Sequence, residues 1–277
     1  MNDVALNIYR LTRILARSVA VLGVCLCVYV LIVPAQQPFV TDNADVTEKG
    51  KFHFEIANEF DRLQTPSLPV KYQSGAHATL AYGLVNNVEV SVTGQYLGLV
   101  SGGHPRVSDG ISDTTFSVKY NFYKERETSF LPALTISAYV QFPTGNAPRG
   151  LGSGITDFGI NGIAQKTFRK QNVFRLNGGI LFSGNTLTGA IGFTTVRGQV
   201  FTGGVSYVRR VSDTLQLGGE ITGAVAANFQ LSKGQLQSQF GGNYQFRKNT
   251  TFDFGFIIGR FSASPRYGLQ LGFSHDF

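Results

Sequence analysis

Most of the chain beyond residue 50 alternates between apolar and polar positions with a period of two. The final segment, Tyr267–Phe277, shows the pattern clearly, because its Tyr, Leu, Leu and Phe residues are separated by Gly, Gln and Gly. A period of two places the two sets of side chains on opposite faces of a β-sheet. The pattern therefore predicts strands that have one apolar face and one polar face.

Twelve segments along the chain show this alternation. Most are 10 to 14 residues long, whereas strands of globular proteins average about 5–6 residues. Tilted strands that cross a bilayer need about 9–11 residues, so the lengths favour a membrane barrel. The expected strands are 51–60, 73–82, 87–99, 112–123, 131–142, 155–168, 172–183, 198–210, 214–225, 236–246, 250–260 and 266–277.

The connections between the expected strands alternate in length. Those after even-numbered strands are short, as at Val211–Asp213, and those after odd-numbered strands are mostly longer, as at Val100–Ile111. Outer-membrane barrels alternate short periplasmic turns with longer outer loops in this way. An even strand count also leaves both termini at the short-turn end. Because backbone groups in hydrocarbon need hydrogen-bond partners, such a sheet must close on itself.

These features predict an all-β fold, namely a transmembrane antiparallel up-and-down β-barrel of about 12 strands over residues 51–277. The alternative is a soluble all-β protein that buries its apolar faces in a core. The strand lengths, the alternating connections and the character of the N-terminus weigh against that alternative.

The N-terminus has the pattern of a secretory signal peptide, and we assign residues 1–35 to it. Three arginines before residue 18 precede an apolar stretch, Ser18–Val33, and Val33-Pro34-Ala35 has the small or apolar residues of a cleavage site. An uncleaved anchor helix is the alternative, but the stretch is short for a membrane span. We expect cleavage, a periplasmic N-terminal segment at 36–50, and localisation in the bacterial outer membrane.

Composition narrows the chemistry that the mature chain can carry. The chain is 43% hydrophobic and 15% charged, which excludes a disordered protein. Both cysteines, Cys25 and Cys27, lie in the expected leader. The mature chain therefore has no disulfide, thiol nucleophile or cysteine-ligated metal site. Loss of the leader lowers the formal net charge from +7 to +5, a modest value that does not require a nucleic-acid partner.

Two segments resemble known outer-membrane barrels. The last strand ends in Phe277 and resembles the signal that the barrel-assembly machinery recognises, which makes that machinery an expected partner. The segment Pro38–Glu55 contains Thr41-Asp42-x-x-Asp45, then Gly50 and an aromatic-rich strand. It resembles the opening of the bacterial outer-membrane transporter family of the meta-pathway of phenol degradation. The resemblance implies passage of small solutes, including aromatic or hydrophobic compounds, and supplies no site residues.

A barrel of twelve strands encloses a narrow lumen, since about 8 strands are filled by side chains and 16–18 leave an aqueous channel. The inward positions are polar and carry both signs of charge, so one interpretation is a wet channel whose charges and Tyr139 select solutes. The other interpretation is a set of ion pairs that fills and stiffens the barrel. The candidate solute-lining residues are His53, Glu55, His77, Glu89, Lys119, Tyr139, Arg175, Glu220, Asp253 and Gln270.

The sequence therefore predicts an outer-membrane channel for passive or facilitated diffusion of small solutes, gated by the outer loops 100–111, 143–154 and 184–197. The acidity of residues 36–50 also allows them to plug the barrel from below. The alternatives are an outer-membrane enzyme, such as a lipase- or protease-like barrel, and a closed structural or adhesive barrel.

No catalytic residue, metal site or cofactor is expected. The His-x-Ser pair of barrel phospholipases does not occur in the sequence, since His77 is followed two residues later by Thr79. A metal cluster of His53, Glu55 and His77 is conceivable, but a hydrogen-bonded trio explains these residues as well.

The expected partners are a small-molecule solute and outer-membrane lipid, without nucleic acid. Basic residues gather at the short turns, where they either contact anionic headgroups or form a solvated rim. These residues are Lys124, Arg126, Arg169, Lys170, Arg209, Arg210, Arg247 and Lys248.

Overall fold

The computed structural model describes residues 38–65, 70–102, 107–126, 129–183, 198–226 and 234–277. The expected leader and the outer loop 184–197 lie outside these residues. The strands are β1 (Phe52–Leu63), β2 (Val70–Val85), β3 (Val88–Ser101), β4 (Val107–Ile111), β5 (Thr114–Tyr123), β6 (Ala133–Phe142), β7 (Asp157–Phe168), β8 (Asn172–Ser183), β9 (Gly198–Arg210), β10 (Leu215–Ala226), β11 (Gln235–Arg247), β12 (Thr250–Gly259) and β13 (Pro265–Asp276).

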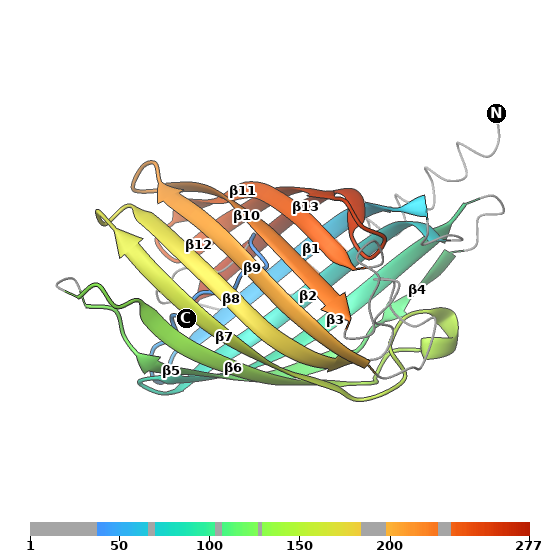
Figure 1. Ribbon diagram of the computed structural model, residues 1–277, viewed down its shortest axis with the longest axis horizontal. Helices are drawn as coiled ribbons and strands as arrows, with labels where there is room; N and C mark the ends of the chain where they lie inside the picture. The colour runs from blue at the N-terminus through green and yellow to red at the C-terminus, as the bar shows by residue number, and fades with distance from the viewer. Residues whose placement is uncertain (1–37, 66–69, 103–106, 127–128, 184–197, 227–233) are drawn as a thin grey trace.

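The strands form a closed antiparallel barrel, as the alternation predicts (Figure 1). Each strand of the ring pairs with its chain neighbours, and β1 pairs with both β2 and β13, which closes the sheet. Twelve of the described strands make up this ring, and β4 stands outside it. The prediction of an all-β, 12-stranded up-and-down barrel is confirmed.

Part of one segment expected to be a long outer connection forms a strand instead. β4 turns back along the end of β3, where Val107 pairs with Val100 and Ile111 pairs with Tyr96. The expected connection 100–111 is therefore partly a hairpin that extends the barrel wall. The physical reason is that the exposed edge at the end of β3 offers backbone groups that the returning chain can pair with.

The outward side chains of the barrel are apolar and exposed, the reverse of a soluble protein. Phe240 is 60% exposed and Leu269 is 46% exposed, whereas the inward Gln239 and Asp253 are 0% and 1% exposed. An apolar exterior of this kind is stable against hydrocarbon rather than water. Within the described residues, no helix has the length and apolar character needed to span a bilayer.

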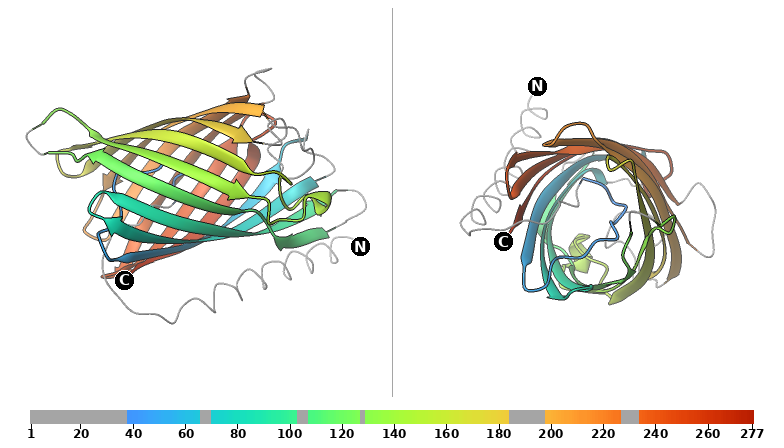
Figure 2. Two further views of the ribbon diagram at one scale, coloured as in Figure 1. Left: turned by 90° about the horizontal axis from the view of Figure 1, so that it is seen from below. Right: turned by 90° about the vertical axis from the view of Figure 1, so that its left-hand side faces the viewer.

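The N-terminal segment, residues 38–50, lies inside the ring of strands (Figure 2). It joins β1 at the short-turn end through a turn at Gly50, whose φ of 78° is left-handed and suits glycine. The Gly50 amide donates to the Gly83 carbonyl at 2.8 Å, and the Gly83 amide donates to Lys51 at 3.1 Å. A side chain at Gly83 would collide with the Glu48 carbonyl, so glycine permits the close crossing.

Candidate functional site

The N-terminal segment is bound to the inner wall first at β3, β5 and β6. The amide and hydroxyl of Thr47 donate to the Glu89 carboxylate at 2.8 and 2.7 Å. The Ala44 carbonyl accepts from Asn121 Nδ2 at 2.7 Å and from the Thr135 hydroxyl at 2.6 Å. These contacts hold the segment against one side of the lumen.

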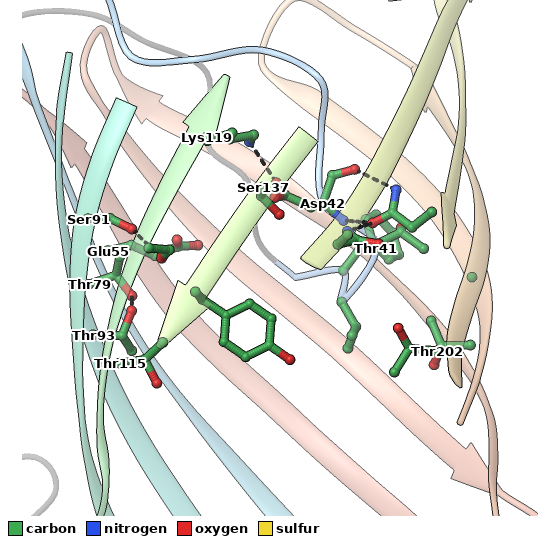
Figure 3. Close-up of a pocket in the computed structure, with 18 of the residues that line it drawn as sticks. Thr41, Asp42, Glu55, Thr79, Ser91, Thr93, Thr115, Lys119, Ser137 and Thr202 are labelled. Atoms are coloured by element: carbon green, nitrogen blue, oxygen red, sulfur yellow. Dashed lines mark hydrogen bonds and ion pairs between the residues drawn. The ribbon is translucent and has the colours of Figure 1, made fainter. Parts of the chain in front are cut away.

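Asp42 marks the point where the segment crosses towards the opposite wall. Its carboxylate accepts from Lys119 Nζ at 2.7 Å, and the Lys119 side chain is 5% exposed. Its backbone exchanges two hydrogen bonds with Asn177 of β8, at 2.7 and 3.1 Å. Figure 3 shows the Lys119 side chain pointing from the barrel wall towards Asp42. The buried ammonium group is therefore paired, as a buried charge must be.

Glu220 of β10 holds the far end of the segment. Its carboxylate accepts from the Val40 amide, the Thr41 amide and the Thr41 hydroxyl, each at 2.8 Å. Next to it, Gln239 of β11 donates to the Pro38 carbonyl at 2.6 Å. The described segment thus runs across the lumen from β3 to β11. Its path narrows the barrel near the middle of the strands.

A second chain segment narrows the other end of the barrel. The connection between β6 and β7, residues 143–156, folds inward, and we call it the inward loop. Asp113 anchors it by accepting from the Gly145 amide at 2.9 Å and the Ser153 amide at 2.7 Å. Leu151 is 1% exposed because it packs against apolar neighbours on the inner wall. Those neighbours are Leu63, Val70, Leu97 and Leu99.

Local geometry explains why the inward loop takes this course. It contains a short 3-10 helix, η2 (Ala147–Arg149), whose N-cap Asn146 accepts from the Arg149 amide. The helix ends at Gly150, whose φ of 75° is left-handed. A side chain at Gly152 would collide with the Asp113 carboxylate. Glycine at that position therefore lets the loop close around its anchor.

A cavity of about 520 Å³ borders the N-terminal segment inside the barrel. This volume falls in the range of about 300–1,000 Å³ that is usual for small-molecule sites. One wall is a ladder of hydroxyl groups on β2, β3 and β5, in which Thr79 bonds Thr93 and Ser91 bonds Ser117, both at 2.8 Å (Figure 3). The opposite wall includes Thr202, and Asp42 of the N-terminal segment closes one side.

Half of the candidate lining residues border this cavity, and some of them also hold the N-terminal segment. Glu89 and Lys119 do both, whereas Glu220 holds the segment without lining the cavity. The candidates that border the cavity are His53, Glu55, Glu89, Lys119 and Tyr139.

Three of the remaining candidates have side-chain hydrogen-bond partners along the wall. Arg175 donates to Gln165 at 3.1 Å, and Asp253 accepts from Asn243 at 2.7 Å. Gln270 accepts from Gln239 at 2.7 Å. Each of these three contacts is a hydrogen bond to an uncharged amide side chain rather than an ion pair.

His53, Glu55 and His77 are not brought together as a metal site. His53 Nδ1 lies 2.6 Å from Asp276, and its Nε2 lies 4.0 Å from Glu55. His77 is in register with Ala57 rather than with either of them. In the part of the chain that the structure describes, no group of His, Cys, Asp or Glu side chains is arranged to hold a metal ion.

Sequence reasoning missed three residues that shape the lumen: Thr41, Asp113 and Leu151. Asp113 sits at the start of a strand and Leu151 in a glycine-rich loop, where neither breaks the expected pattern. The acidity of the N-terminal segment was the one available signal, and Asp42 does pair with a lumen cation.

Comparison with known proteins agrees with the barrel. The family model described as "Putative MetA-pathway of phenol degradation" matches residues 35–277. An outer membrane channel from Pseudomonas putida F1 has a TM-score of 0.66 and 13% identity, over 84% of this chain and 98% of that one. The KdgM porin has a TM-score of 0.54 and 10% identity, over 81% of this chain and 99% of the porin. Curated protein sequences give no match.

Proposed function

Because the chain belongs to the phenol-degradation family whose model covers residues 35–277, we propose that it is an outer-membrane channel through which small solutes diffuse. The observation that carries this proposal is a cavity of about 520 Å³, bordered by hydroxyl and charged side chains, inside a closed barrel. A barrel that served only as a scaffold would gain stability by filling that space. The similar solved structures, a channel and a porin, share the fold and support the same function.

Two chain segments narrow the pathway. A solute entering from the outer end passes the inward loop, which Asp113 and Leu151 hold in place. It then meets the N-terminal segment, which crosses the lumen between Glu89 and Glu220. Passage follows either around this segment or after part of it leaves the wall. No cofactor takes part, since diffusion down a gradient needs only an open path.

The cavity wall carries a series of hydroxyl groups, and a solute that moves along it can form a hydrogen bond with one hydroxyl after another. The hydroxyls of Thr79, Ser91, Thr93 and Ser117 form such a series, and the Tyr139 ring adds an aromatic surface. A neutral one-ring compound fits the volume and both kinds of contact. The description of the family makes small aromatic compounds the first solutes to test.

We also propose export directed by the signal peptide 1–35, which precedes the described residues, and assembly in the outer membrane through Phe277. The Phe277 amide donates to the Phe52 carbonyl at 2.9 Å, so the chain end completes the seam between β13 and β1. Phe277→Ala should slow barrel assembly in cells. Unchanged assembly of this variant would contradict the role of Phe277.

The test of the channel is single-channel recording of the refolded mature protein in a planar bilayer, with folding verified by heat-modifiable gel migration. Discrete conductance steps that small aromatic compounds block, and that sugars of similar size do not, would support the proposal and its solute class. Steps that no aromatic compound blocks would support the channel and contradict the solute class. A silent bilayer from folded protein would contradict the channel and direct attention to enzymatic or adhesive function.

A further inference from the structure

The charged side chains of the barrel are distributed unevenly between its ends and its interior. The chain as a whole is basic, with a formal net charge of +7, and many of its basic residues lie at the short turns. On the inner face of the described strands, carboxylates outnumber basic side chains. The inward carboxylates include Glu55, Glu59, Glu89, Glu220 and Asp253, and the inward bases include Lys119 and Arg175.

The cavity itself has the same imbalance. Among the described residues that line it, Asp42, Glu55 and Glu89 carry carboxylates and Lys119 carries an ammonium group. Lys119 is 2.7 Å from Asp42, so this pair adds no net positive charge. His53 also lines the cavity and lies 2.6 Å from the Asp276 carboxylate, so even a protonated imidazole there is balanced. The net charge of the lining is therefore negative.

The rest of the described lining is uncharged. It consists largely of hydroxyl, amide and glycine groups, including Thr79, Thr93, Thr115, Thr202 and Asn177. Such groups donate and accept hydrogen bonds without preference for the sign of a charge. A neutral solute therefore meets compensating hydrogen bonds throughout the cavity, whereas an anion also meets the carboxylates.

We propose that the lumen selects by charge, so that cations and neutral hydrogen-bonding molecules pass and small carboxylates and phosphates are held back. This inference rests on the proposed channel function and specifies its solutes. The physical basis is that a narrow, water-filled passage with low-dielectric walls focuses the field of its charges on the permeating species. Among aromatic solutes, it predicts that neutral phenols enter and aromatic carboxylates do not.

The effect is large enough to measure. Two net charges acting on an ion about 10 Å away in a water-like dielectric, reduced by salt screening, correspond to a K⁺/Cl⁻ permeability ratio of at least about three. The reversal potential of the open channel in a KCl gradient reports this ratio directly. Swelling of proteoliposomes in a neutral pentose and in the matching aldonate reports it for organic solutes, and we expect swelling only in the pentose.

Substitutions of lining residues test whether the cavity charges cause the selectivity. The double variant Glu55→Gln and Glu89→Gln keeps the side-chain shapes, and we expect its permeability ratio to fall to near one. Thr115→Lys adds a positive charge to the same cavity and should lower the ratio even if the double variant does not fold. The control is Asp213→Asn, which removes the same charge from an exposed turn at the rim and should leave the ratio unchanged.

The possible results distinguish a failure of charge selection from a failure of the channel function itself. Conductance with a ratio of one or below, or equal swelling in the pentose and the aldonate, would overturn charge selection and leave the channel standing. A high ratio that Asp213→Asn abolishes, and that the cavity variants do not alter, would also overturn it. Folded protein that neither conducts nor supports swelling in either solute would overturn both.

Discussion

Removing the Glu220 carboxylate is expected to release the far end of the N-terminal segment and widen the lumen. In Glu220→Ala, the Val40 amide and both donors of Thr41 lose their acceptor, three hydrogen bonds at 2.8 Å. Residues beyond this point remain anchored, because Asp42 keeps its contacts with Lys119 and Asn177. Pro38 also keeps its hydrogen bond from Gln239, so the release should be confined to residues 39–41.

The magnitude follows from the three contacts. A hydrogen bond to a charged group contributes about 1.5–3 kcal/mol, but the freed donors can bind water in the lumen and neighbouring losses are not additive. We therefore expect local docking to weaken by about 2–4 kcal/mol, well below the sum of the separate bonds. At tenfold per 1.4 kcal/mol, this multiplies the undocked population by about thirtyfold to several hundredfold.

Two assays report this release. Hydrogen–deuterium exchange of a peptide that covers residues 38–47 should show faster exchange at Val40 and Thr41, and single-channel conductance should rise. Gln216→Ala is the matched control, since Gln216 faces inward from the same strand and its removal costs the segment none of the three bonds. Unchanged exchange and conductance in a folded Glu220→Ala barrel would refute the assignment of Glu220 as the anchor.

Three further predictions address the outer face, the outer mouth and the cavity wall. Phe240→Arg places a charge at an exposed mid-strand site and should lower the free energy of unfolding in lipid by about 2–4 kcal/mol; a near-zero change in a denaturant titration would argue against lipid contact. Asp113→Ala removes the acceptor of two inward-loop amides, so we expect larger conductance and faster proteolysis within 143–156, and unaltered values would contradict its role. Gly159→Ala puts a methyl group 2.6 Å from the Tyr139 ring, so the ring must move, and we expect the conductance to change. In the control Gly162→Ala the new methyl group has only ordinary contacts, and the conductance should stay unchanged. Identical recordings from the two variants would show that the Tyr139 ring does not shape the pathway.

The fold followed from local alternation because a barrel strand is specified by its own side chains. Each outward residue meets lipid and each inward residue meets the lumen, whichever strand lies beside it. This is why the inward position of Glu220 could be predicted without knowing its partners. The hairpin of β4 could not, since Val107–Ile111 pairs with β3 through backbone groups that leave little trace in the side-chain pattern.

Local alternation was sufficient to predict the barrel, the twelve strands of its ring and the inward side chains on those strands. What those side chains do is visible only in the folded chain, because the contacts of the N-terminal segment join residues far apart in the sequence, such as Thr41 to Glu220 and Asp42 to Lys119. The packing of Leu151 against Val70 of β2 and Leu97 and Leu99 of β3 also joins distant parts of the sequence. Alternation records only the local environment of a residue, whereas these pairings depend on how twelve strands curve around a shared interior.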